Sequence, residues 1–136
     1  MNEWSERFMT MNFGISNSFN QQQKSAYIKQ QYNEIYAHEQ AHKRAAGSFG
    51  GAIVIEKDAN GIPTGGHVDI LMPALNKDNP DETIKHAETV IKAAMAPGDP
   101  SDQDYKVAAE AQHIKAEAET YKSQNGSAGQ NLNIIV

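Results

Sequence analysis

Residues 38–42 read His-Glu-Gln-Ala-His, an HExxH motif inside a longer segment that has helical periodicity. Residues four apart on a helix stack on one face, so the imidazoles of His38 and His42 reach the same point beside the helix. The carboxylate of Glu39 lies between them in the sequence. Two imidazoles and an acid in this spacing are typical of a metal site that holds zinc.

The segment around the motif predicts one helix from about Ser18 to Ala46. Gly47 follows it and can take the left-handed conformation that ends a helix. His38 and His42 then lie in the last turns, on the side that faces the rest of the protein. The residues that recur at three- or four-residue steps through this segment are Ile28, Tyr32, Ile35, His42 and Ala46.

A β-hairpin is predicted next, since a β-branched run at Ala52–Glu56 and a second extended run that reaches Leu71 flank Asn60-Gly61. Asn-Gly between two such runs is a strong hairpin signal, because both residues tolerate positive φ. The pair Gly65-Gly66 interrupts the second strand. Such a pair marks either a bulge alone or a close approach of another backbone or a ligand.

Two further helices follow the hairpin. Asn79 is the N-cap of the first, with Pro80 at its first position and Glu82 placed to complete a capping box. The segment Pro97–Pro100 ends it. Ser101 then caps a third helix, whose regular apolar steps predict an antiparallel pair with the second; these residues are Val107, Ala111, Ile114, Ala118 and Tyr121.

The predicted fold class is α+β, mainly helical, with three helices and one β-hairpin inserted after the HExxH helix. A chain of 136 residues makes one domain. We expect a single zincin-like metal-binding domain at 18–122, a flexible N-terminal arm at 1–17 and a flexible tail at 123–136.

Composition narrows the class of partners and ligands. The chain has 17 acidic and 12 basic residues, a net charge of −5, and no Lys/Arg cluster, so we expect no nucleic-acid partner. It has no cysteine, so a metal must be held by His, Asp or Glu. No segment has the length and apolarity of a membrane span or a classical export signal. We therefore expect a soluble protein, cytoplasmic by default.

The third metal ligand is harder to assign, and His67 is our prediction. It lies 25 positions beyond His42 on an extended segment, directly after the glycine pair. Asp69 is in phase with His67 on the strand and is an alternative, either as the ligand or as a group that orients it. An acidic ligand on a later helix has no clear match. The residues for which a surface role is the better interpretation are His86 and His113, and Glu34 is a weak candidate to orient His38.

Several spaced motifs resemble one known family over about 36–119. They are Tyr36–His42, Ala45–Gly47, Gly65-Gly66, Thr83-Ile84, Ala93–Pro97, Pro100-Ser101, Gln103-Asp104 and Val107–Ala109. Together they closely resemble the SprA-related family, and the resemblance implies a bacterial zinc metallopeptidase. In the family pattern a Glu usually follows the glycine pair, whereas this chain has His67; either residue can ligate zinc.

The mechanism expected for such a site is hydrolysis of a peptide bond in a peptide or protein substrate. Zn²⁺ held by His38, His42 and His67 would polarise the carbonyl and lower the pKa of water toward about 7. Glu39 would act as general base. The alternatives are a non-catalytic zinc-binding module and a metal-free helical interaction module. The oligomeric state stays open.

Overall fold

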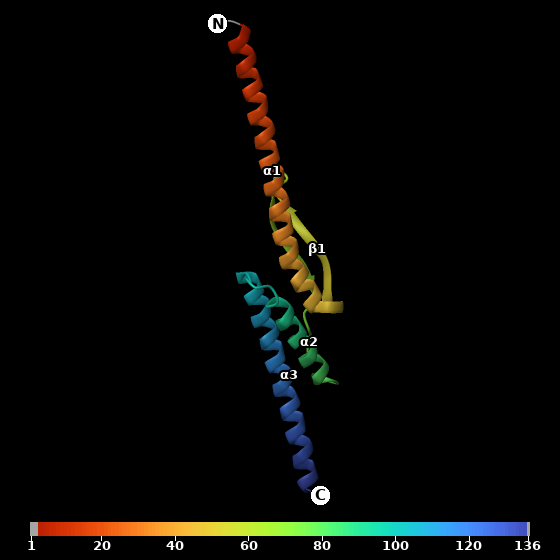
Figure 1. The fold of residues 1–136 in the computed structure, drawn as a ribbon. Helices are drawn as coiled ribbons and strands as arrows, with labels where there is room; N and C mark the ends of the chain where they lie inside the picture. The colour runs from red at the N-terminus through yellow and green to blue at the C-terminus, as the bar shows by residue number, and fades with distance from the viewer. Residues whose placement is uncertain (1–2, 136) are drawn as a thin grey trace.

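The computed structural model describes the backbone of residues 3–135 and the side chains of residues 20–125. The predicted fold class is confirmed: the described chain is mainly helical, with a two-stranded antiparallel hairpin (Figure 1). In chain order the elements are α1 (Glu3–Ala46), the 3₁₀ turn η1 (Gly47–Phe49), β1 (Gly50–Lys57), β2 (Pro63–Ile70), α2 (Pro80–Ala94) and α3 (Asp102–Ile135).

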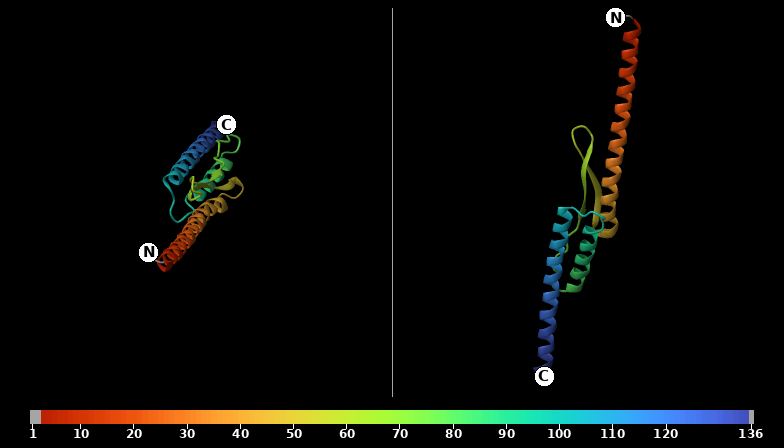
Figure 2. Two further views of the ribbon diagram at one scale, coloured as in Figure 1. Left: turned by 90° about the horizontal axis from the view of Figure 1, so that it is seen from above. Right: turned by 60° about the vertical axis from the view of Figure 1, so that its left-hand side comes forward.

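Both outer helices are longer than the sequence pattern predicts. α1 begins at Glu3 rather than near Ser18, and α3 continues to Ile135 rather than ending near residue 122. Extending a helix that has already formed needs no new nucleation, so weak helix formers can continue it. Figures 1 and 2 show the N-terminal part of α1 and the C-terminal part of α3 extending from opposite sides of the packed centre. The flexibility expected for 1–17 and 123–136 stays a prediction.

The end of α1 and the turn of the hairpin follow the sequence signals. Gly47 has φ 57° and Gly61 has φ 76°, both in the left-handed region that favours glycine. The Asp58 carboxylate accepts hydrogen bonds from the backbone N–H of Asn60 (2.8 Å) and Ile62 (3.0 Å), which closes the turn. The short connection at Gly47–Phe49 turns the chain back, so the hairpin lies along α1 (Figure 2).

β2 packs on α1 through the second glycine of the pair. A Cβ atom at Gly66 would lie 2.8 Å from Ile35 Cγ2 and 3.0 Å from Glu39 Cγ. The strand therefore approaches the HExxH helix as closely as a glycine permits, which is the close approach that the glycine pair suggests. The register of the hairpin also shifts beside Gly65, between Glu56 and Lys57 on β1.

The core is formed where α2 packs between α1 and α3. The Asn79 side chain accepts a hydrogen bond from Glu82 N–H (3.4 Å), which confirms Asn79 as the N-cap, although the Glu82 carboxylate accepts from Asn76 Nδ2 instead of returning to the cap. Small side chains let the helices approach closely. The fully buried apolar residues of α2 and α3 include Ala87, Val90, Ala93, Ala94, Ala111 and Ala118. Within residues 3–135, no helix combines the length and the apolar character that a membrane span requires.

Candidate metal centre

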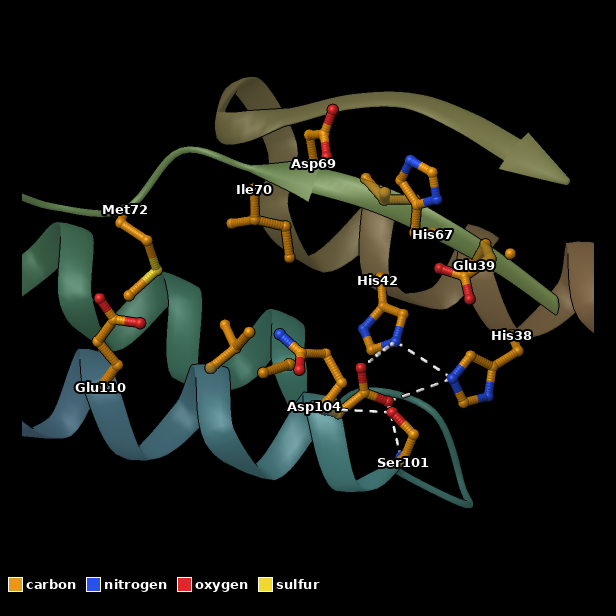
Figure 3. A pocket seen from close by; sticks show the side chains of 15 residues that line it. His38, Glu39, His42, His67, Asp69, Ile70, Met72, Ser101, Asp104 and Glu110 are labelled. Atoms are coloured by element: carbon orange, nitrogen blue, oxygen red, sulfur yellow. Dashed lines mark hydrogen bonds and ion pairs between the residues drawn. The ribbon is translucent and has the colours of Figure 1, made fainter. Parts of the chain in front are cut away.

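The HExxH motif lies on α1 where that helix meets α2 and the first turn of α3. The Nε2 atoms of His38 and His42 lie 3.2 Å apart, and the ring planes are inclined by 76°. His42 is 4% exposed. The two imidazoles thus converge on one point at the buried side of α1, as the spacing of four residues predicts (Figure 3).

Asp104 brings a third donor group to that point. Its Oδ2 lies 3.3 Å from His38 Nε2, and its Oδ1 lies 3.2 Å from His42 Nε2. Within the residues whose side chains are described, His38, His42 and Asp104 form the one group of three or more side chains with metal-ligand chemistry. The group joins the end of α1 to the beginning of α3 (Figure 3).

Asp104 is held in place by the start of its own helix. Ser101 caps α3: its Oγ accepts the N–H of Asp104 (3.1 Å), and the Asp104 carboxylate accepts the N–H of Ser101 (2.8 Å). This reciprocal pair is a capping box, which satisfies two backbone donors that the helix itself leaves free. The hydrogen bonds with Ser101 therefore fix the position of the Asp104 carboxylate. The carboxylate faces the two histidines of α1.

The spacing of the three donor groups fits a tetrahedral zinc ion. Two bonds of about 2.0–2.1 Å that meet at the tetrahedral angle end about 3.3–3.4 Å apart. The two Nε2 atoms are 3.2 Å apart, and each has one Asp104 oxygen at a similar distance: Oδ2 lies 3.3 Å from His38 Nε2, and Oδ1 lies 3.2 Å from His42 Nε2. With one ligand atom taken from each residue, the three atoms lie within 4.8 Å of one another. Two imidazoles and a carboxylate are also a common protein ligand set for zinc. The residues present therefore fit the ion in their chemistry, and the distance between the two Nε2 atoms fits its dimensions.

The outer nitrogen of each ring has its own hydrogen-bond acceptor. His42 Nδ1 donates to the carbonyl of Ala93 on α2 (2.7 Å), and His38 Nδ1 lies 3.2 Å from Asp99 Oδ1. Ligating histidines almost always donate their second N–H to a carbonyl or a carboxylate in this way. With Nδ1 as the donor, the lone pairs of both Nε2 atoms face each other and the Asp104 carboxylate, which is favourable only around a shared cation or proton.

Glu39 lies on the wall between the two histidines and β2. It is 6% exposed, yet none of the hydrogen bonds or ion pairs found among the described side chains involves its carboxylate. Burial raises the pKa of the Glu39 carboxyl above its ordinary value, while the nearby imidazoles of His42 and His38 act to lower it. No buried side-chain oxygen among the described residues lacks a partner, so the Glu39 carboxylate oxygens are accessible from the cleft. A carboxylate with a raised pKa beside two imidazoles has the properties of a general base.

The Asp104 carboxyl is shifted in the opposite direction. Burial acts to raise its pKa, but the hydrogen bonds from Ser101 and the electrostatic influence of the nearby His42 imidazole outweigh burial and hold the pKa below its ordinary value. The surroundings of the two carboxyl groups thus shift their pKa values in opposite directions. Asp104 is the acceptor of fixed hydrogen bonds, and Glu39 is the one left without a partner.

His67 does not join this group in the structure. It pairs with Val54 across the hairpin, and the neighbouring Gly66 is the residue whose position faces α1. Successive side chains on a strand point to opposite faces, so the His67 side chain lies on the outer face, with 47% exposure, and Nδ1 is 3.1 Å from Glu56 Oε1. Figure 3 shows its ring turned away from the two histidines of α1. Asp69 has the same phase and is exposed.

The remaining candidates also lie outside the group. His86 Nε2 donates to the carbonyl of Leu71 (2.7 Å), and its ring stacks on Phe49 with 3.7 Å between centroids. The exposed His113 lies farther along α3, and exposed Glu34 accepts a hydrogen bond from Gln30 rather than from His38. A surface role for His113 agrees with this placement.

Sequence reasoning missed Asp104 and Asp99, although both leave a trace in the sequence. Asp104 is the third residue after the Ser101 cap and belongs to the motif Gln103-Asp104. An acid three residues after a Ser N-cap is explained by a capping box, so the sequence pattern gives no reason to expect a second role for it. Asp99 lies in the Pro-Gly-Asp-Pro stop between α2 and α3, where only the tertiary fold brings it to His38.

An open cleft of about 470 Å³ runs past the metal group. Its helical wall is formed by α1, α2 and the first turns of α3, and the opposite wall by five consecutive residues of β2, 66–70, followed by Met72. Five consecutive residues bring alternating side chains to the cleft, so the edge of the strand borders it rather than one face. β2 has a hydrogen-bonded partner strand on one side only, namely β1.

The chain matches the model of the SprA-related family over residues 15–129, and it belongs to that family. The match includes every residue of the metal group and the whole hairpin. No curated protein and no solved structure matches the chain.

Proposed function

We propose that this protein is a zinc-dependent metallopeptidase. The observation that carries the proposal is the group of His38, His42 and Asp104, whose possible ligand atoms lie within 4.8 Å of one another. Both imidazole rings in it are oriented through Nδ1. Three protein ligands are typical of a catalytic zinc site, whereas structural sites have four. The described side chains supply three, which supports a catalytic role over the non-catalytic zinc-binding module.

The residues of the chain divide the work of hydrolysis between them. Zinc supplies Lewis acidity, which polarises a carbonyl and makes water acidic enough to act at neutral pH. Glu39 takes the proton of the attacking water and passes it to the amine that leaves. Ala93 and Asp99 hold the rings of His42 and His38 in position. Gly66 of β2 packs against the aliphatic part of Glu39 and limits the positions that its side chain can take.

The cleft supports a peptide as the substrate. A strand edge with free backbone groups binds an extended peptide by adding it as another strand, and main-chain hydrogen bonds then supply affinity. The edge of β2 borders the cleft beside the metal group. A peptide laid along this edge would pass the HExxH motif, with alternate carbonyl groups bonded to β2 and the others directed away from it.

The test is Glu39→Gln, since it removes the base and keeps the three metal ligands. We expect unchanged zinc content by mass spectrometry and a loss of peptide hydrolysis of about 10²- to 10⁴-fold, the usual contribution of a general base. Glu34→Gln is the matched control, because Glu34 is exposed on the same helix and outside the metal group. It should leave both quantities unchanged.

Two results would separate the alternatives. If zinc binds with the affinity of a protein site but neither the wild-type chain nor Glu39→Gln hydrolyses peptides, the protein is a non-catalytic zinc-binding module. If the purified chain takes up no zinc from a zinc-containing buffer, and His42→Ala has the same zinc content as the wild-type chain, the metal-free interaction module is the correct interpretation. Full hydrolysis by Glu39→Gln would contradict the role of the base.

A further inference from the structure

The cleft continues beyond the metal group along α3, and its character changes there. Next to the metal group it is polar; farther along, Ile70, Met72 and Val107 give it an apolar lining. Glu110 lines the far end, and Figure 3 shows its carboxylate facing Met72 at the end remote from His38. We call this apolar part of the cleft, lined by Ile70, Met72 and Val107, the trough. A trough that ends in a carboxylate favours a ligand with an apolar stem and a positively charged end.

The geometry of α3 sets the length of this trough. Gln103, Val107 and Glu110 recur at steps of four and three, so they share the face of the helix that lines the cleft. Asp104 and Glu110 are six residues apart, which corresponds to about 9 Å along the helix axis. A long unbranched side chain of a peptide bound beside the metal group can span much of that distance.

Charge adds a second, independent constraint. Outside the metal group, the carboxylate at the end of the trough is that of Glu110, and no Lys or Arg lines any part of the cleft. A cleft lined by one sign of charge favours ligands of the opposite sign. Glu110 is exposed, and among the described side chains no ion pair neutralises it. Its carboxylate is therefore available to a cation that enters the trough.

We propose that this trough is a specificity subsite for a Lys or Arg side chain of the peptide, with Glu110 as the residue that pairs with the charge; the inference rests on the proposed function. The aliphatic stem packs along Ile70, Met72 and Val107 while the charged head reaches Glu110, which is how long basic side chains cover apolar surface. The protein then cleaves peptides next to a basic residue.

The experiment measures binding rather than hydrolysis. Three eight-residue peptides differ at one central position, which carries Lys, norleucine or Glu in an otherwise uncharged sequence, and each is titrated against zinc-loaded Glu39→Gln. Norleucine keeps the stem and lacks the ammonium, so the Lys-to-norleucine ratio isolates the charge. We expect the Lys peptide to bind about fivefold more tightly than the norleucine peptide, the upper range for a partly exposed charge pair, and the Glu peptide to bind weakest.

The variant that tests the residue is Glu110→Lys, made in the Glu39→Gln background. It should reverse the order, so that the Glu peptide binds more tightly than the Lys peptide, whereas Glu110→Gln should make the Lys and norleucine peptides equal. Glu117→Lys is the matched control, because it makes the same charge change on an exposed position of the same helix, outside the cleft. It should keep the preference for Lys. Circular dichroism confirms the helical content of each variant.

The outcomes separate the subsite from the activity. Equal binding of the three peptides, or a Lys preference that Glu110→Lys leaves intact, overturns the subsite even if the wild-type chain hydrolyses peptides. A Lys preference that reverses in Glu110→Lys, in a protein that hydrolyses none of the peptides, supports the subsite and contradicts the peptidase. A change in Glu117→Lys equal to that in Glu110→Lys shows an effect of net charge alone and also overturns the assignment.

Discussion

The two walls of the cleft contribute by different means. The helical wall supplies side chains: two imidazoles from α1 and a carboxylate from α3, each held by a hydrogen bond to a neighbour. The strand wall supplies main chain, with a glycine pressed against α1 and the side chain of His67 turned outward. In the proposed peptidase, the helices would supply the metal ligands and the strand would align the substrate. Substitutions on the two walls should therefore have different kinds of effect.

The largest effect is expected from Asp104→Asn on the helical wall. The amide oxygen still accepts the Ser101 N–H, but the charged zinc ligand is lost, so we expect zinc affinity to fall by about 100-fold or more, at or beyond the upper range for groups that only orient a ligand. Zinc affinity is measured by competition with a chelating dye. Ser101→Ala is the control: it removes the cap, at about 0.5–2 kcal/mol of stability, and keeps the ligand. Equal zinc loss in both variants would contradict the role of Asp104.

On the strand wall the largest effect is expected on folding. In Gly66→Ala the new methyl group meets Ile35 Cγ2 at 2.8 Å and the backbone oxygen of Val54 at 2.9 Å. We expect the free energy of unfolding in urea to fall by about 1–3 kcal/mol, as in other overpacked sites. Gly65→Ala is a control one residue away, because its nearest atom is Glu56 Oε2 at 3.8 Å. If the two variants are equally stable, β2 does not press on α1 at Gly66.

A smaller effect is expected from Asp99→Asn. Asp99 orients His38, but its side chain is 93% exposed, so water screens the interaction and replaces part of it. We expect zinc affinity to fall by about tenfold at most, the lower limit for groups that orient a ligand. The same dye competition measures it. A loss as large as that of Asp104→Asn would mean that Asp99 itself is a ligand.

The smallest effect is expected from His67→Ala. The ring is nearly half exposed, pairs with Glu56 on the outer face and lies outside the metal group. We expect zinc affinity and the unfolding midpoint to stay within the range of ordinary surface substitutions, about ±0.5 kcal/mol. Loss of zinc in this variant would restore His67 as the third ligand and remove the distinction between the two walls.

The sequence predicts the local part of the site and misses the long-range part. His38 and His42 converge because of helix geometry alone, so four residues of sequence suffice to place them together. Asp104 is 66 positions from His38, and its arrival depends on how α2 and α3 pack, which no local pattern encodes. The sequence correctly predicts that Ser101 caps α3. It does not reveal that the Asp104 carboxylate, which belongs to the same cap, also faces α1.

The prediction for His67 fails to meet the structure for a different reason. The hairpin, its turn and the close approach at the glycine pair all follow from the sequence. The face of β2 that packs on α1 does not, because a shift of one residue exchanges the two faces of a strand. The residue that faces the helix at the point of closest approach must be a glycine, because a side chain there does not fit. Gly66 takes this place, so the neighbouring His67 lies on the outer face of the hairpin. A histidine next to a glycine pair on a strand therefore cannot be assigned to a face until the packing partner is known.

The capping box of α3 gives the metal group a thermodynamic consequence. Because the Asp104 carboxylate both accepts the Ser101 N–H and completes the donor set, ion binding and the ordering of that helical turn are linked equilibria. Each favours the other by the same free energy. An ion bound by this group would therefore stabilise the loop that joins α2 and α3 and would hold the end of α1 to the beginning of α3.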